Sequence, residues 1–190
     1  MKTEIQPLTA DGGHLSYRAL LDQAMLAARN LDETLLDFDG GLRTPRGAEC
    51  FSKKIGDKTL CIGLDSWESV SDPVISISFD DPDSRIPLAQ IFISPEVASR
   101  LCVLVPQLIP RVLNLPTGVA GKPEEISDLD AVPNASHGDL LISTRCIGLR
   151  RDLMLEQPGV DRICLHPLEL QDLVWGLIAA LKALDWIHEI

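Results

Sequence analysis

Residues 74–96 read VISISFDDPDSRIPLAQIFISPE, and this stretch decides the fold. Over residues 74–79, isoleucine and phenylalanine alternate with serine, which is the period-two pattern of a strand with one buried face. A turn rich in aspartate follows, and a further strand is predicted over residues 86–93. Ser94 and Pro95 are residue types that begin a helix, as the N-cap and the first helical residue. The stretch therefore predicts two strands followed directly by a helix.

A similar unit lies 72 residues further along the chain. Strands are predicted over residues 139–149 and 160–165, with a Pro-Gly turn before the second, and a helix over residues 166–188. Without a gap, Pro95 falls on Pro167, and upstream apolar positions also coincide. Two explanations stay open, because few positions are identical: a true duplication, or the general appearance of strands that lead into a helix. Ile91 and Ile163, Leu101 and Leu173, Ile75 and Ile147, and Ile77 and Leu149 are further matched pairs.

The rest of the chain supplies a first helix over residues 15–37 and a hairpin of strands over 48–54 and 59–64. Residues 1–13 look like a flexible lead-in. Together, the elements predict one α+β domain over residues 1–190, with an antiparallel-rich sheet of about six strands and three helices: N-terminal, central and C-terminal. The apolar seam of the first helix is Leu21, Ala24, Ala28, Leu31, Leu35 and Phe38.

Two features set the second and third helices apart. The central helix contains Pro106 and Pro110, which lack a backbone donor, so we expect it to kink or break near them. The C-terminal helix is apolar nearly all round between Leu173 and Leu184, with Trp175 as a large anchor. We therefore expect it to be buried on more than one side, and we expect the chain to self-associate through it.

Charge and cysteine content limit the classes of protein to which the chain could belong. The net charge is −11, from 28 acidic and 17 basic residues, which disfavours direct binding to nucleic acid or anionic membranes and suits a basic protein partner. No apolar leader and no run long enough to span a bilayer occurs. The five cysteines are scattered with no CxxC pair, so we expect free thiols in a cytoplasmic protein. They are Cys50, Cys61, Cys102, Cys146 and Cys164.

The motifs that resemble catalytic or ligand sites are incomplete. Residues 118–123 lack the spacing and hydroxyl of a phosphate loop, and residues 37–41 lack the later ligands of a calcium loop. His166 and Glu169 stand at a helix start, where a capping arrangement explains both residues better than a catalytic base does. The sequence therefore predicts no catalytic residue, no metal and no cofactor.

Candidate partner-binding residues come from the acidic turns and the tryptophans. Residues 116–138 form the longest stretch without a regular pattern, rich in proline, glycine and acid, and a connection of that length is often functional. Trp67 lies in a polar loop, and exposed tryptophans are enriched at binding hot spots. The candidate residues are Trp67, Asp80, Asp81, Asp83, Glu124, Glu125 and Trp175.

The leading hypothesis is an acidic, cytoplasmic, non-enzymatic protein-binding module: a chaperone, adaptor or inhibitor of another protein. The predicted order of helix, four strands, helix, two strands and helix resembles that of small acidic chaperones that hold secretion substrates, in topology and charge but without a shared motif. Two alternatives remain. One is an enzyme with a site assembled around His137, Asp139 and the stretch 116–138, and the other is a structural subunit with the C-terminal helix as its interface.

Overall fold

The computed structural model describes residues 16–28, 49–65, 73–80, 87–113, 124–134, 138–147, 150–160 and 162–188. Within them the chain is α+β, as predicted, with three α-helices and one short 3-10 helix, η2. In chain order the elements are α1 Tyr17–Ala28, β1 Glu49–Ile55, β2 Lys58–Asp65, β3 Val74–Asp80, β4 Ala89–Ile93, α2 Pro95–Leu113, β5 Glu124–Val132, β6 Leu140–Ile147, β7 Arg150–Glu156, β8 Ile163–Leu165, η2 Pro167–Glu169 and α3 Leu170–His188.

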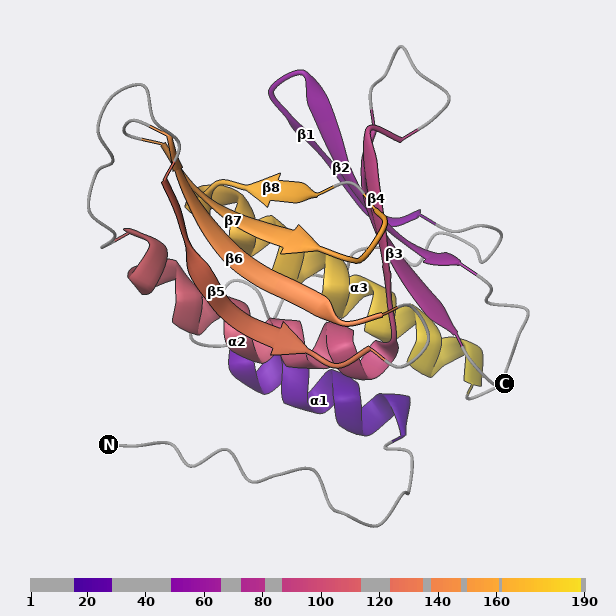
Figure 1. Cartoon of the computed structure of the whole chain (residues 1–190). Helices are drawn as coiled ribbons and strands as arrows, with labels where there is room; N and C mark the ends of the chain where they lie inside the picture. Colours follow the sequence, from indigo (N-terminus) through magenta and orange to yellow (C-terminus); the bar gives the residue numbers. More distant parts are fainter. Residues whose placement is uncertain are drawn as a thin grey trace, which may run out of the picture.

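The strands form two four-stranded antiparallel sheets, in the orders β1-β2-β3-β4 and β5-β6-β7-β8 (Figure 1). The described residues thus hold eight strands rather than about six. The additional strands are β5, inside the stretch expected to be irregular, and β7, between two predicted strands. Four successive residues of β7 are buried, so it shows no period-two alternation. The second half therefore does not have the strand count on which the likeness to small secretion chaperones rested.

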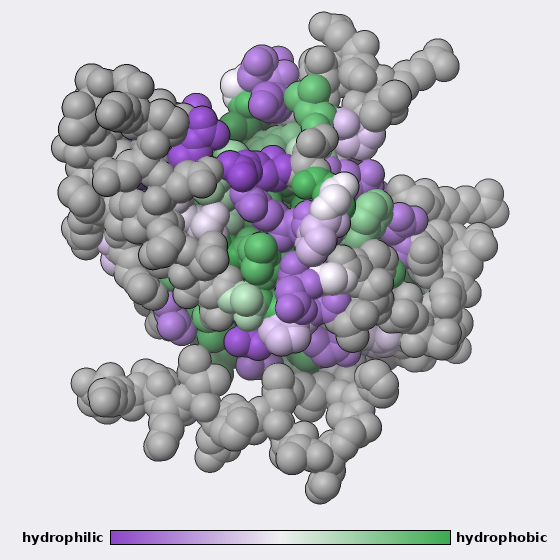
Figure 2. Space-filling view, viewed as in Figure 1, coloured by the Kyte–Doolittle hydropathy of each residue, from purple (hydrophilic) through white to green (hydrophobic). Residues whose placement is uncertain are grey.

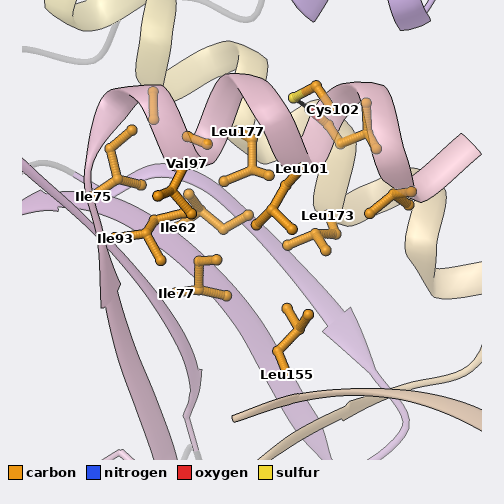
Figure 3. Close-up of a cluster of buried hydrophobic side chains, with 14 of the residues drawn as sticks. Ile62, Ile75, Ile77, Ile93, Val97, Leu101, Cys102, Leu155, Leu173 and Leu177 are labelled. Atoms are coloured by element: carbon orange, nitrogen blue, oxygen red, sulfur yellow. Dashed lines mark hydrogen bonds between the residues drawn. The ribbon is translucent and has the colours of Figure 1, made fainter. Parts of the chain in front are cut away.

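One apolar core joins both sheets to the three helices. Inward positions of each sheet are buried, and the same core includes residues of α1, α2 and α3. Figure 3 shows side chains of both sheets pointing at those of α2 and α3. The labelled residues are Ile62, Ile75, Ile77 and Ile93 from the first sheet, Leu155 from the second, Val97, Leu101 and Cys102 from α2, and Leu173 and Leu177 from α3.

Helix α2 begins where the sequence predicts, at Pro95, and the Ser94 hydroxyl accepts a hydrogen bond from the Val97 N–H at 3.3 Å. The expected break does not occur, because the helix continues through Pro106 and Pro110 to its end. Residues on its inward face on both sides of the prolines are buried in the core, and this packing offsets the lost backbone bonds. These residues are Leu101, Val105, Leu108 and Val112.

Helix α3 is buried on more than one side, as predicted. It lies against β1 and β2 of the first sheet and against α1 and α2. A Cβ added at Gly176 would overlap Ile62 and reach Phe51 at 3.0 Å, so the missing side chain lets the helix approach β2 closely. Neighbours within the same chain account for its apolar faces. Self-association through α3 stays a prediction, and the apolar pattern no longer requires it.

The helices of the two sheet–helix units contact each other at matched positions. Cys102 of α2 and Val174 of α3 are 72 residues apart, and the Cys102 thiol approaches the Val174 carbonyl oxygen at 3.9 Å. The gapless match upstream is wrong, however. Ile75 pairs with Ile93 in the first sheet, whereas Ile147, its expected counterpart, ends β6 and pairs with Arg150. The likeness is one of topology, and a true duplication stays a prediction.

Candidate functional site

Among the predicted partner-binding residues, Asp80 and Trp175 are the two whose side chains the structure describes. Trp67, Asp81, Asp83 and His137 lie outside the described residues. Asp80 ends β3, and Trp175 is half-buried in α3 against the core. Glu124 and Glu125 are the first two residues of β5. Asp139, named for the enzyme alternative, is exposed just before β6.

Strand β5 is the described element in which acidic residues are most concentrated. It has nine residues, reading EEISDLDAV, and four of them are acidic. It stands at the end of the second sheet and pairs with β6 alone among the described residues (Figure 1). Its register with β6 shifts between Ile126 and Asp130, which marks a bulge. Residues 124–132 of the stretch expected to be a loop therefore form an outer strand of a sheet.

The sequence reasoning missed β5, although one signal was present. Pro123 and Pro133 bracket the strand, and prolines commonly bound strands in this way. Asp128 and Asp130 join Glu124 and Glu125 on the same strand and extend the candidate set.

The outward face of the second sheet carries an arginine network. Arg145 on β6 is paired in register with Asp152 on β7. Asp152 is only 4% exposed, and Arg150 Nε donates to both of its carboxylate oxygens, at 2.8 and 3.0 Å. This hydrogen bond raises the pKa of Arg150. Figure 2 shows hydrophilic and hydrophobic residues interleaved over the part of this view that is not grey. Because Arg150 and Asp152 are bonded to each other, we interpret this pair as structural.

The thiols of the described residues are not activated. Burial raises the pKa of Cys50 to about 11, and burial together with the neighbouring Asp80 carboxylate raises that of Cys61 to about 12. Burial also raises the pKa of Cys102 and Cys164. None of these four cysteines forms a disulfide, while the side chain of Cys146 is not described. A protonated thiol is a weak nucleophile and a poor metal ligand at neutral pH.

The described residues hold neither a candidate metal centre nor a helix that could span a membrane. Within them, no group of three or more histidine, cysteine, aspartate or glutamate side chains is placed to hold a metal ion. No helix among them is long and apolar enough to cross a membrane.

A buried pair of amides closes the edge of the first sheet. Gln157 Oε1 accepts from the Phe92 N–H at 2.9 Å, and Gln157 Nε2 donates to the Phe92 carbonyl. Asn134 Nδ2 donates to the same carbonyl at 3.0 Å, and Asn134 Oδ1 accepts from the Ser94 N–H at 3.3 Å. We call Asn134 and Gln157, which are 2% and 4% exposed, the amide clamp. It hydrogen-bonds backbone groups of Phe92 in β4 and of Ser94 directly after it.

Comparison with known proteins adds no identity. The chain matches no protein-family model, and no curated protein matches it.

Proposed function

We propose that the protein is an acidic, non-enzymatic protein-binding module, a chaperone, adaptor or inhibitor, and that it holds a basic protein through β5. The observation that carries the proposal is the acidic edge strand. Four of the nine residues of β5 are acidic, and among the described residues the strand has a partner on one side alone. A sheet edge offers backbone donors and acceptors, and its charge selects the sign of the segment that approaches.

The charge of the whole chain supports the same partner. A net charge of −11 creates a negative field that raises the rate of encounter with a basic surface and lowers it for an acidic one. Long-range attraction acts on the association rate and is screened by salt. Contacts at β5 would then act at short range, where removing a charge beside the partner weakens the complex directly.

The test compares two variants with the same change in net charge. In the β5 variant, Glu124→Gln, Glu125→Gln, Asp128→Asn and Asp130→Asn remove four charges from the edge strand. In the control variant, Asp22→Asn, Asp57→Asn, Glu96→Gln and Asp139→Asn remove four charges from exposed positions elsewhere.

Partners are first captured from the native cell and identified by mass spectrometry, and binding of the purified partner is then measured at several salt concentrations. We expect the β5 variant to lose affinity by about tenfold or more and the control variant to lose much less, because only β5 would contact the partner. Equal losses of affinity in both variants would show that the net charge of the protein, and not a contact at β5, accounts for the effect. Unchanged affinity in the β5 variant would contradict the proposal.

A further inference from the structure

The helical segment η2, which leads directly into α3, is capped by a histidine. His166 Nδ1 accepts a hydrogen bond from the Leu168 N–H at 3.3 Å, and the His166 carbonyl accepts one from the Glu169 N–H at 2.8 Å. The Glu169 carboxylate in turn accepts from the His166 N–H at 2.8 Å. The preferred N-cap residues are serine, threonine, aspartate and asparagine, none of which ordinarily changes its charge near neutral pH. The acceptor at His166, in contrast, can be removed by a proton.

The hydrogen bond from Leu168 depends on the protonation state of the imidazole ring. A ring nitrogen that accepts a hydrogen bond carries no proton, so the neutral His166 ring has its proton on Nε2. In a histidinium both ring nitrogens are donors, and Nδ1 can then no longer accept from Leu168. The bond is therefore present where the ring is neutral and lost as the pH falls through the range in which histidine ordinarily titrates, near about pH 6.5. A positive ring at the N-terminal end of a helix is also disfavoured by the helix dipole.

The matched start of α2 is built from groups that do not titrate. Ser94, which lies 72 residues before His166, accepts a hydrogen bond from the Val97 N–H through its hydroxyl at 3.3 Å. The Ser94 N–H donates to the Asn134 amide oxygen, at the place where the His166 N–H donates to a carboxylate. A hydroxyl and an amide keep their charge and their acceptors throughout the range in which histidine titrates. Acid therefore acts on one of the two caps alone.

The segment that His166 caps is docked in the core but can open locally. Pro167 and Leu170 are buried, whereas Leu168 between them is 78% exposed. The His166 ring is half-buried, so protons from the solvent can reach it. Water can also hydrate the Leu168 N–H once its acceptor is lost, because the bond lies at an exposed position. Loss of the cap therefore loosens the start of the helical segment without unfolding the rest of the core.

The charges on the elements packed against η2 stay constant in the pH range in which histidine titrates. These elements are α2, β7 and α3. Arg150 of β7 lies within electrostatic range of both Glu169 and Asp152. Arginine and lysine remain charged and carboxylates ordinarily remain ionised between about pH 7.5 and about pH 5.5, so they form a fixed background for His166. The charged side chains that the structure describes on these elements are Glu96 and Arg100 on α2, Arg150, Arg151, Asp152 and Glu156 on β7, and Asp172, Lys182 and Asp185 on α3.

We propose that the start of the C-terminal helical segment is a pH-sensitive element of the fold, in which protonation of His166 releases the Leu168 N–H and loosens residues 166–170. The start of α2 at Ser94 does not respond. The second sheet–helix unit thus has a response to acid that the first unit lacks. This inference goes beyond the proposed function and does not depend on it.

The test exchanges the titrating cap for the cap that α2 uses. His166→Ser gives η2 a hydroxyl acceptor that does not titrate, and Ser94→Ala, which removes the other cap, is the control. Thermal melts of the full chain compare about pH 7.5 with about pH 5.5. We expect the melting temperature of the wild type to fall on acidification by about 2–4 °C more than that of His166→Ser, as the loss of one capping bond should produce. Ser94→Ala should melt at a lower temperature than the wild type by the same amount at both pH values.

Hydrogen exchange supplies the local measurement. The exchange rate of the Leu168 amide is divided by that of an unstructured chain at the same pH, which removes the ordinary effect of pH on exchange. We expect this ratio to rise about fivefold from the higher to the lower pH in the wild type and to stay constant in His166→Ser, because one hydrogen bond is lost in the wild type alone.

A cap without a pH response would shift the melting temperature of His166→Ser equally at the two pH values, and that result would overturn the proposal. His166→Asn, which also has an acceptor that does not titrate, repeats the comparison if the serine variant does not fold. A response to acid that persists in both His166 variants but disappears in Glu169→Gln would belong to the carboxylate and would also overturn the proposal. Loss of the response in Ser94→Ala would show that it is not local to His166, with the same consequence.

Discussion

The outer strands β1 and β5 occupy corresponding places in two sheets of the same strand order, yet they differ in charge. Strand β1 reads ECFSKKI and is basic at Lys53 and Lys54, whereas β5 reads EEISDLDAV. The inward faces of the two sheets are alike, because both are buried in one core. Burial therefore restricts the inward residues of both sheets, while the edges are free to differ. The two halves therefore differ in the charge of these outer strands.

The largest expected loss of stability comes from the core that the two halves share. Leu101 in α2 and Leu173 in α3 are matched positions, and both are fully buried. We expect Leu101→Ala and Leu173→Ala each to lower the free energy of unfolding by about 2–5 kcal/mol, through lost burial and the cavity that remains. Chemical denaturation, followed by circular dichroism and tryptophan fluorescence, measures both. Two separated transitions, each shifted by one substitution alone, would show that the halves fold independently.

The next largest effect is expected at Gly176 of α3, which matches Leu104 of α2 and has no side chain. Gly176→Ala adds a Cβ where Ile62 leaves no room, so we expect a loss of about 1–3 kcal/mol although alanine favours a helix. Gln171→Ala, at a half-buried position of the same helix, is the control and should change stability by less than about 0.5 kcal/mol. Thermal melts of both variants give the comparison. Stabilisation by Gly176→Ala would mean that α3 does not lie close to β2.

A third prediction tests whether the amide clamp closes the edge of β4. Gln157→Ala removes the side-chain acceptor of the Phe92 N–H, so we expect a loss of about 1–3 kcal/mol and faster hydrogen exchange at Phe92. Gln90→Ala changes the same residue type within β4, two residues away, and serves as the matched control. An unchanged exchange rate at Phe92 in Gln157→Ala would show that the edge of β4 is not closed by this side chain.

The smallest effect compares the caps of α2 and of the helical segment that leads into α3. Ser94 receives one N–H bond, from Val97, whereas His166 and Glu169 form a reciprocal box: the Leu168 N–H donates to His166 Nδ1, and the His166 N–H donates to Glu169 Oε2 at 2.8 Å. We expect Ser94→Ala and Glu169→Ala each to cost about 0.5–2 kcal/mol, as losses of single capping bonds do. Denaturant titration measures both. If neither variant lost stability, capping bonds would not explain where these helices begin.

Local patterns predicted the elements that depend on neighbours in sequence. The alternation around Ile77, the start of α2 at Ser94 and the box of His166 with Glu169 follow from residue spacing alone, and the structure confirms them. The residue types also predicted the hairpin turn before Lys58. In the structure, Gly56 in this turn adopts a φ of 64°, which glycine tolerates.

Other features depend on contacts between distant segments and left little trace in the sequence. Strand β7 is buried on both faces, so the alternation that reveals β3 is absent from it. In β5, acidic residues stand where apolar ones would signal a strand. Asn134 and Gln157 look like ordinary turn residues, and their role at Phe92 depends on tertiary packing across 42 and 65 residues of chain.

Hydrogen exchange of the backbone amides, with and without the captured partner, tests the central claim most directly. Exchange reports protection of individual segments and so distinguishes the four edges from one another. We expect the captured partner to slow exchange in residues 124–132 of β5 and to leave exchange at Phe92 and in β1 unchanged. Protection that appears on β1, on β4 or on the helices, with none on β5, would contradict the assignment of the binding site to the acidic edge of the second sheet.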